Sequence, residues 1–497
     1  MATNSKAFSS RSAMRSERAV PSLQAISRAA CAGALSLLLA ACDNGSLNAD
    51  ESTFHLRSLN LVEDSPTLQI DLDDTTIASL AYGAATSFSA AHPGAHDLTF
   101  HAVLPPDLDD DDDDDETTTP ASGSTSYTFV GATDYTVVAY GRLADIRTFI
   151  IEGFDQREDV DDDKLALHFT HAAADMPALD VYITSVQAGI ATRQYVDTLN
   201  LTESSTPLEL TLNRDDDDLD DDAALTAEVV IELTATGTGE TLYRSNTMTL
   251  GEGSRVLFAI AKNSGPGPAA LKLVLAGSGS GDQRHHLDGA ALKFIHASND
   301  TPALDVTVGS GLADPLALNV GFRQSSAYVS IRDSENGMIA VPAGMASPYV
   351  FFEEFSAAAG QYYSAYALGP ASVVDAVVFA ADGRSVPTQT TFRFLHAAAS
   401  LEEQDPLDLY LRLPGEVVDF DDDETVATVS SMTYQTASSY QTLKEGDYEI
   451  YFAYAGSSTI VLGPAPFHVT NGEVTTLALI NAEDGSLELL PIADAAR

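Results

Sequence analysis

One short phrase occurs three times along the chain, and a weaker fourth version stands near its start. Each copy has an apolar stretch, a turn with one proline, and a second stretch in which apolar and polar residues alternate. The copies are HLRSLNLVEDSPTLQIDL from His55, LHFTHAAADMPALDVYI from Leu167, KFIHASNDTPALDVTV from Lys293 and FRFLHAAASLEEQDPLDLYL from Phe392. They are about 100 or more residues apart, whereas solenoid repeats span about 20 to 50 residues. The repeated unit is therefore a whole domain.

Each copy is predicted to form two β-strands joined by a turn. In the second copy, Leu167 and Phe169 share one phase with His171, and smaller or polar residues occupy the other phase. This period of two is typical of a strand with one buried face. The proline lies in the turn, where its missing N–H leaves no gap in a strand ladder.

Later features recur in the same order in each copy. A glycine-bearing turn leads into an aromatic strand, and a tyrosine-rich or apolar strand closes each domain. About seven short strands, with turn signals about every 8 to 12 residues, are typical of a β-sandwich. The chain is therefore predicted to be all-β. We place four sandwich domains, called repeats 1 to 4, at residues 51–154, 163–278, 288–384 and 390–492.

Three of these recurring features resemble a known family. The third hairpin (HASNDTPALDV), the turn VPAGMASPY and the closing strand DYTVVAYG are similar to the bacterial domain of unknown function 4397. The resemblance implies tandem immunoglobulin-like sandwiches in an exported protein, and it implies no activity. Repeat 1 departs most, because Asn60 stands where the other copies have histidine and Gln69 where they have aspartate.

The N-terminal segment is predicted to be an export signal. Basic residues precede an apolar run over residues 29–41, which is too short to span a bilayer. The run ends in Leu39-Ala40-Ala41-Cys42, which resembles the lipobox of bacterial lipoproteins, so residues 1–42 are predicted to be a lipoprotein signal peptide with Cys42 as the lipidation site. A plain secretory signal is the alternative.

Lipidation would hold the chain to a bilayer, since each buried CH₂ contributes about 0.8 kcal/mol. The protein is then expected on the periplasmic face or the cell surface, with the choice of inner or outer membrane left open. Cys31 lies within the predicted signal and is the only other cysteine. The mature chain would therefore have no thiol for a disulfide, a zinc–thiolate site or a nucleophile.

A histidine and an aspartate recur on the two sides of the hairpin turn. The pairs are His171 with Asp180, His296 with Asp305, and His396 with Asp408. Such pairs are found in acid–base catalysis. Each histidine, however, lies in phase with apolar neighbours, and no serine or cysteine recurs beside it as a nucleophile. We therefore predict a structural motif in which the histidine satisfies backbone groups of the turn.

Four runs rich in aspartate interrupt the repeats, at residues 109–116, 161–163, 215–222 and 421–424. Carboxylates suit Ca²⁺, which takes six to eight oxygen ligands. The runs lack the alternation and the turn glycine of a calcium loop, and they occupy different places in the repeats. We expect hydrated insertions and no cofactor, with loose divalent-cation binding as the alternative. The weak metal candidates are Asp109, Asp111, Asp113, Asp215, Asp217, Asp421 and Asp423.

Composition and the absence of catalytic motifs reduce the number of function classes that fit the sequence. A formal net charge of −48 argues against nucleic acid as a partner. Neither G-x-S-x-G nor H-E-x-x-H occurs, so we expect no enzyme. The sequence favours a lipid-anchored envelope protein with a binding, adhesion or structural role toward an unidentified protein or glycan. The alternatives are a cation-dependent adhesin or stalk, and a carbohydrate-active envelope enzyme.

Overall fold

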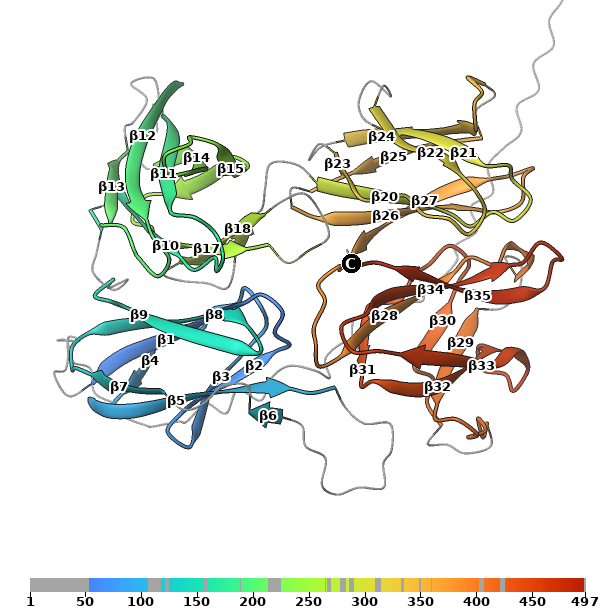
Figure 1. Cartoon of the computed structure of the whole chain (residues 1–497), viewed down its shortest axis with the longest axis horizontal. Coiled ribbons are helices and arrows are strands. Elements are labelled where there is room, and N and C mark those ends of the chain that lie inside the picture. The colour runs from blue at the N-terminus through green and yellow to red at the C-terminus, as the bar shows by residue number, and fades with distance from the viewer. Residues whose placement is uncertain are drawn as a thin grey trace, which may run out of the picture. The chain divides into compact units, whose positions relative to one another are not determined.

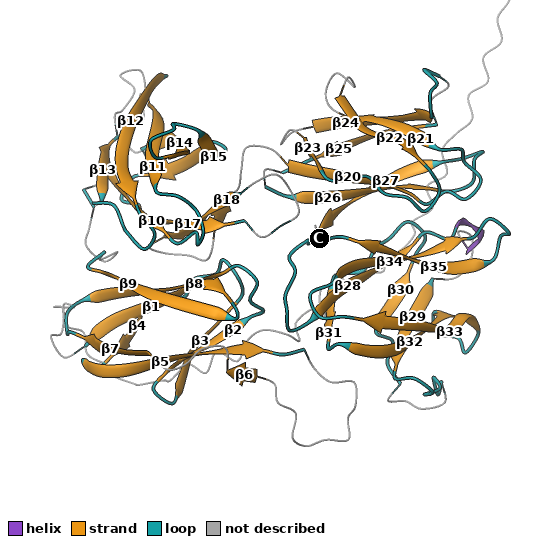
Figure 2. Cartoon of the chain, in the orientation of Figure 1, coloured by secondary structure: helices purple, strands orange, loops and turns teal. Residues whose placement is uncertain are grey.

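The computed structural model describes most of the chain after the N-terminal segment. The described residues are 53–105, 118–120, 125–154, 160–161, 163–187, 189–212, 225–263, 265, 270–277, 283–285, 290–308, 314–331, 335–347, 350–358, 360–401, 406–420 and 425–495. Their regular elements are all strands apart from one 3-10 turn, η1 (Ala399–Leu401) (Figure 2). Within these ranges, no helical segment has the length and apolarity needed to cross a bilayer.

Each repeat contributes a sheet that has the repeat's first strand at an inner position; this sheet is called the A-sheet (Figure 1). In repeat 1 its order is β4 (Ser89–Ala91), β1 (Phe54–Val62), β8 (Asp134–Arg142) and β9 (Asp145–Glu152). In repeat 2 it is β13 (Leu208–Thr211), β10 (Lys164–His171), β17 (Arg255–Lys262), β18 (Leu271–Gly277) and β19 (Gln283–His285), the last of which lies beyond the predicted boundary at residue 278. In repeat 3 it is β23 (Val329–Ile331), β20 (Ala290–His296), β26 (Tyr362–Leu368) and β27 (Asp375–Ala381). In repeat 4 it is β31 (Gln441–Leu443), β28 (Thr390–His396), β34 (Val474–Asn481) and β35 (Leu487–Ala493).

The other sheet of each repeat is antiparallel and is called the B-sheet. In repeat 1 its order is β3 (Thr75–Leu80), β2 (Leu68–Leu72), β5 (Gly94–Val103) and β6 (Thr118–Pro120), with β7 (Thr125–Phe129) also on β5. In repeat 2 it is β12 (Ile190–Leu199), β11 (Leu179–Gln187), β14 (Thr226–Ala235) and β15 (Thr241–Arg244), with β16 (Met248–Gly251) also on β14. In repeat 3 it is β22 (Asp314–Val320), β21 (Leu304–Val308), β24 (Glu335–Pro342) and β25 (Phe351–Ser356). In repeat 4 it is β30 (Val429–Met432), β29 (Leu407–Arg412), β32 (Gly446–Tyr454) and β33 (Ile460–Val469).

The prediction of an all-β chain with tandem sandwiches is confirmed. In every repeat the first strand pairs in parallel with a strand near the repeat's end, as β1 does with β8. Parallel neighbours require a long connection, which the strands between them supply. This order places the first and last strands in one sheet, whereas the constant-type immunoglobulin order puts strands ABED in one sheet and CFG in the other.

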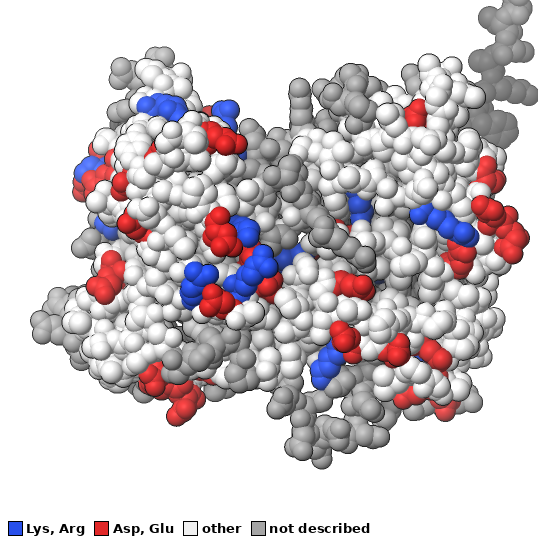
Figure 3. Space-filling view, viewed as in Figure 1, with Lys and Arg blue, Asp and Glu red and all other residues white. Residues whose placement is uncertain are grey.

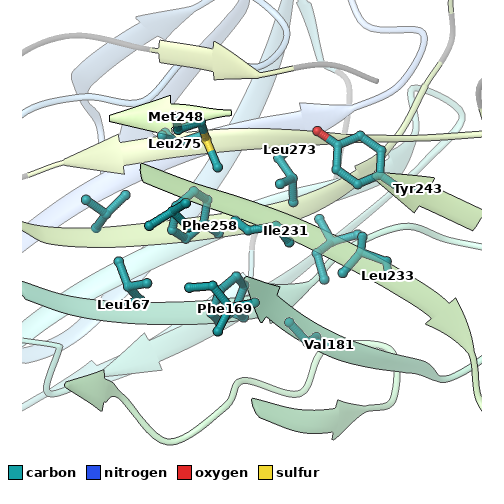
Figure 4. Packing of buried hydrophobic residues seen from close by; sticks show 14 of the residues in the cluster. Leu167, Phe169, Val181, Ile231, Leu233, Tyr243, Met248, Phe258, Leu273 and Leu275 are labelled. Atoms are coloured by element: carbon teal, nitrogen blue, oxygen red, sulfur yellow. The ribbon is translucent and has the colours of Figure 1, made fainter. Parts of the chain in front are cut away.

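Each repeat has a hydrophobic core of its own between its two sheets. In repeat 2, Phe169 of β10 stacks on Phe258 of β17 with ring centroids 5.1 Å apart. Val181 and Ile231 of the B-sheet pack onto them from the opposite layer (Figure 4). The inward phases of both sheets thus meet as alternating strands require.

The outer face of the A-sheet is also buried, because the repeats pack in pairs. One cluster joins repeats 1 and 2 and includes Leu59 and Val138 of the first repeat with Leu257 and Val274 of the second. A second cluster joins repeats 3 and 4 in the same way. The prediction of a half-buried opening strand is therefore wrong: β10, β20 and β28 are buried on both faces, and so is nearly all of β1.

Candidate functional site

The motif histidine ends the first strand of repeats 2 to 4, and in two of them its ring holds the hairpin turn. The Nε2 of His171 lies 3.1 Å from the carbonyl oxygen of Pro177, and the N–H of Ala173 donates to Nδ1 at 3.2 Å. His296 makes the same two contacts, with Pro302 at 3.1 Å and Ser298 at 3.3 Å. Because Nδ1 accepts a hydrogen bond, the ring proton lies on Nε2, which donates to the carbonyl.

Burial keeps these rings neutral. Removal from water lowers the pKa of His171 and of His296, and the bond to the proline carbonyl opposes this only in part. Burial lowers the pKa of His396 to about 4. Its Nδ1 is buried without a hydrogen-bond partner among the described residues, and residues 402–405 of its turn lie outside them. A neutral, buried imidazole is suited to holding backbone groups.

In repeat 1 an asparagine, Asn60, occupies the position of the motif histidine and also holds backbone groups. The side-chain oxygen of Asn60 accepts the N–H of Val62 at 3.1 Å, two residues on, as Nδ1 of the histidine does. Its Nδ2 donates to the Leu80 carbonyl at 3.0 Å and to Ser65 Oγ at 3.2 Å. A side chain that both accepts and donates is thus what this position requires, and asparagine meets the requirement.

The motif aspartate lies on the B-sheet strand that follows the hairpin turn, and it contacts both a neighbouring strand and a turn of that sheet. In repeat 3, Asp305 Oδ1 accepts the N–H of Asn319 at 2.7 Å, and its Oδ2 accepts that of Gly344 at 2.7 Å. Both donors have positive φ, 52° and 74°, in the left-handed region. Asn319 lies within β22 and Gly344 in the turn after β24, so the carboxylate stabilises the left-handed backbone at both places.

Asp408 and Asp180 also accept two hydrogen bonds each, from different donors. Asp408 accepts the N–H of Ser431 at 2.8 Å and that of Gly456 at 3.3 Å. Asp180 accepts the hydroxyls of Thr198 at 2.5 Å and Thr236 at 2.8 Å. Each aspartate therefore ties the second B-sheet turn to the neighbouring strand of its own repeat.

The histidine and the aspartate of a motif do not act on each other. In the described part of the chain, no hydrogen bond joins a motif histidine to a motif aspartate. The His171 and His296 rings bond to the hairpin turn, whereas the aspartates bond to strands and turns of the B-sheet. A catalytic acid–base pair requires such contact, directly or through the substrate. The arrangement can hold turns but offers no activated nucleophile.

A hydroxyl clamp shared by all four repeats was missed from the sequence. Phe294 N–H donates to Ser326 Oγ at 2.9 Å, and Ser326 N–H donates back to the Phe294 carbonyl at 2.8 Å. The equivalent residues are Thr86, Ser205 and Ser438. The sequence did offer a signal. In each repeat the serine or threonine lies six residues after the last apolar residue of the strand that precedes it, as Ser326 does after Val320 of β22.

A buried basic or histidine side chain on the outer phase of the first strand was also missed. It stands three residues before the motif histidine or asparagine, and each example is at most 5% exposed. The four residues are Arg57, His168, Lys293 and Arg393. In repeats 1 and 4 the arginine Nε donates to a threonine hydroxyl on the parallel partner strand, at 2.8 Å and 2.9 Å. The available signal was a charged residue inside an otherwise apolar strand.

The remaining predicted sites lie outside the described residues. This holds for the lipidation residue Cys42 and for all seven metal candidates, Asp109, Asp111, Asp113, Asp215, Asp217, Asp421 and Asp423. Over the described ranges, no group of three or more histidine, cysteine, aspartate or glutamate side chains could hold a metal ion. On the face shown in Figure 3, the described acidic side chains are interspersed with basic and uncharged ones.

The fold and these clamps define a class of protein, a tandem array of β-sandwiches whose recurring polar residues hold their own turns. The chain belongs to the family described as "Domain of unknown function (DUF4397)", whose model matches residues 54–182, 290–410 and 404–497. The predicted family is thus confirmed. The first match spans repeat 1, so Asn60 and Gln69 are variations within the family.

Comparison with solved structures gives low similarity. The Bacillus anthracis TIE protein is 7% identical with a TM-score of 0.15, and the match covers 86% of this chain and 68% of that one. A proposed cell adhesion protein from Bacteroides ovatus is 11% identical with a TM-score of 0.12, and the match covers 48% of this chain and 98% of that one. TM-scores this low support no conclusion about this chain. No curated protein matches it.

Proposed function

We propose that this chain is a lipid-anchored protein of the bacterial cell envelope that acts as a non-catalytic binding, adhesion or structural module. One observation supports the non-catalytic role. The recurring polar residues of the family motif direct their hydrogen bonds to turns and strands of their own sandwich, as His296 and Asp305 do in repeat 3. A scaffold of this kind leaves its loops and outer strand faces for contacts with partners.

The outer face of the B-sheet in repeat 2 is the surface to test first. Tyr182 of β11 and Tyr195 of β12 lie with ring centroids 5.6 Å apart, and the Arg193 guanidinium lies 3.9 Å from the centre of the Tyr182 ring. Tyr195 is 52% exposed. Aromatic rings beside a planar cation suit either a peptide or a sugar ring.

Repeat 4 covers the corresponding face with its own chain. There Tyr410, at the position of Tyr182, packs against Val418 and is only 7% exposed. Phe420 also packs on this cluster, with its ring centroid 5.4 Å from that of Tyr410. The difference supports repeat 2 as the repeat that offers this face to a partner.

The anchor is tested by labelling the full chain with radioactive palmitate in a bacterial host. We expect label in the wild type and in the matched control Cys31→Ala, and none in Cys42→Ala, which should also leave the membrane fraction. Label that persists in Cys42→Ala would refute the anchor.

The non-catalytic role is tested with a panel of glycan and ester substrates and with binding assays on glycans and envelope proteins. We expect binding that Tyr195→Ala weakens, and no turnover. Hydrolysis that disappears in folded His171→Asn would show that the motif is catalytic.

A further inference from the structure

A buried polar network lies between repeats 3 and 4. Lys293, on the outer phase of β20, places its Nζ 2.7 Å from Oδ1 of Asp494, the residue after β35. The two side chains are 3% and 0% exposed. The Nζ also donates to the Ala493 carbonyl at 2.6 Å. An amine and a carboxyl group from residues 201 positions apart are therefore held in contact without access to water.

The other carboxyl oxygen is surrounded by hydrogen-bond donors. Oδ2 of Asp494 accepts the hydroxyl of Tyr440 at 3.0 Å and the hydroxyl of Thr476. Thr476 in turn accepts Arg393 Nε at 2.9 Å. Two hydroxyl groups, with a guanidinium behind one of them, thus face the oxygen on which negative charge would grow if the carboxyl carbon were attacked.

The environment disfavours a permanent ion pair. Burying two opposite charges carries a desolvation penalty that their attraction offsets only in part. Burial lowers the pKa of Lys293, although the neighbouring carboxylate opposes this shift. A neutral amine is the nucleophilic form of lysine. The corresponding positions in repeats 1 and 2 hold Arg57 and His168, which are not alkyl amines.

We propose that Lys293 and Asp494 form an intramolecular amide bond that ties the first strand of repeat 3 to the end of repeat 4. This inference does not depend on the proposed function.

The chemistry balances without any further reagent. One ammonium proton passes to Oδ1, which leaves a neutral amine and a carboxylic acid. The nitrogen lone pair attacks Cγ, and the negative charge moves to Oδ2, where the Thr476 and Tyr440 hydroxyls stabilise it. A second proton passes from nitrogen to Oδ1, the C–Oδ1 bond breaks, and water leaves. The amide keeps the third proton, and the net charge of the pair is zero throughout.

The test is a peptide map of the full chain after denaturation and digestion with trypsin. We expect the peptide that contains Lys293 joined to the one that contains Asp494, with a mass equal to their sum less one water. Trypsin should not cut after Lys293, since the amide removes its charge. On a denaturing gel the linked chain should run faster than Lys293→Arg, while the matched control Lys444→Arg should run like the wild type.

The wild-type map decides the question even if Lys293→Arg fails to fold. Separate peptides at full yield, with cleavage after Lys293, would overturn the proposal. Water lost only within a single peptide, as from the Asp484–Gly485 step, would also overturn it. Thr476→Val keeps both reacting groups and removes one donor to Oδ2, so newly made chains should form the link at least tenfold more slowly. An unchanged rate would rule out the hydroxyl's part in the reaction.

Discussion

Replacing His296 tests the turn-clamp reasoning most directly. The ring makes two hydrogen bonds, at 3.1 Å to the Pro302 carbonyl and 3.3 Å from the Ser298 N–H, inside a site where the residue is 0% exposed. Each bond contributes about 1 kcal/mol, and a buried group that loses its partner costs about 1 to 3 kcal/mol. His296→Ala should therefore destabilise repeat 3 by about 2 to 4 kcal/mol. His296→Asn should recover part of this loss, because the Asn60 side chain in repeat 1 accepts the N–H two residues on, as His296 Nδ1 does.

Hydrogen exchange read by mass spectrometry on the full chain is the suitable assay, because a chain of several domains need not unfold in one step. Faster exchange in His296→Ala should be largest in peptides over β20 and β21, and smallest in repeats 1 and 2. His468→Ala is the matched control, since that histidine is exposed on β33 and contacts Asp447. Unchanged exchange in His296→Ala, or equal losses in the alanine and asparagine variants, would refute the clamp.

Three further predictions concern packing, pH and cations. Leu257→Ala should cost about 2 to 4 kcal/mol and speed exchange in repeats 1 and 2, because Leu257 lies in the cluster between them; Phe258→Ala, in the core of repeat 2, should speed exchange in repeat 2 alone. Burial lowers the pKa of His168 to about 4 from 6.5, so its contribution is complete above pH 6.5 and is lost as the pH falls toward 4, by at most about 3 kcal/mol. In urea unfolding, His168→Gln should flatten this pH dependence, and an unaltered slope would contradict the assignment. If the acidic runs are only hydrated insertions, millimolar Ca²⁺ and NaCl of matched ionic strength should give equal melting temperatures, whereas a higher value in Ca²⁺ alone would show binding.

The sequence alone determined the local features of this protein. Alternation around Leu167 and Phe169 indicated strands, and the spacing of the copies indicated whole domains. The in-phase position of His171 indicated a role in the turn rather than in catalysis. Strand period and turn chemistry can be read from the sequence because they depend on neighbours within a few residues.

Only the tertiary structure decided what covers the outer face of the A-sheet. His168, Lys293 and Thr170 occupy the polar or mixed phase of their strands, and sequence reasoning assigned that phase to solvent. In the fold this phase is buried because two A-sheets pack against each other. The contact between Lys293 and Asp494 is also visible only in the tertiary structure, since it joins residues 201 positions apart. Periodicity shows that a strand has two faces, but what packs on each face depends on residues that are distant in the sequence.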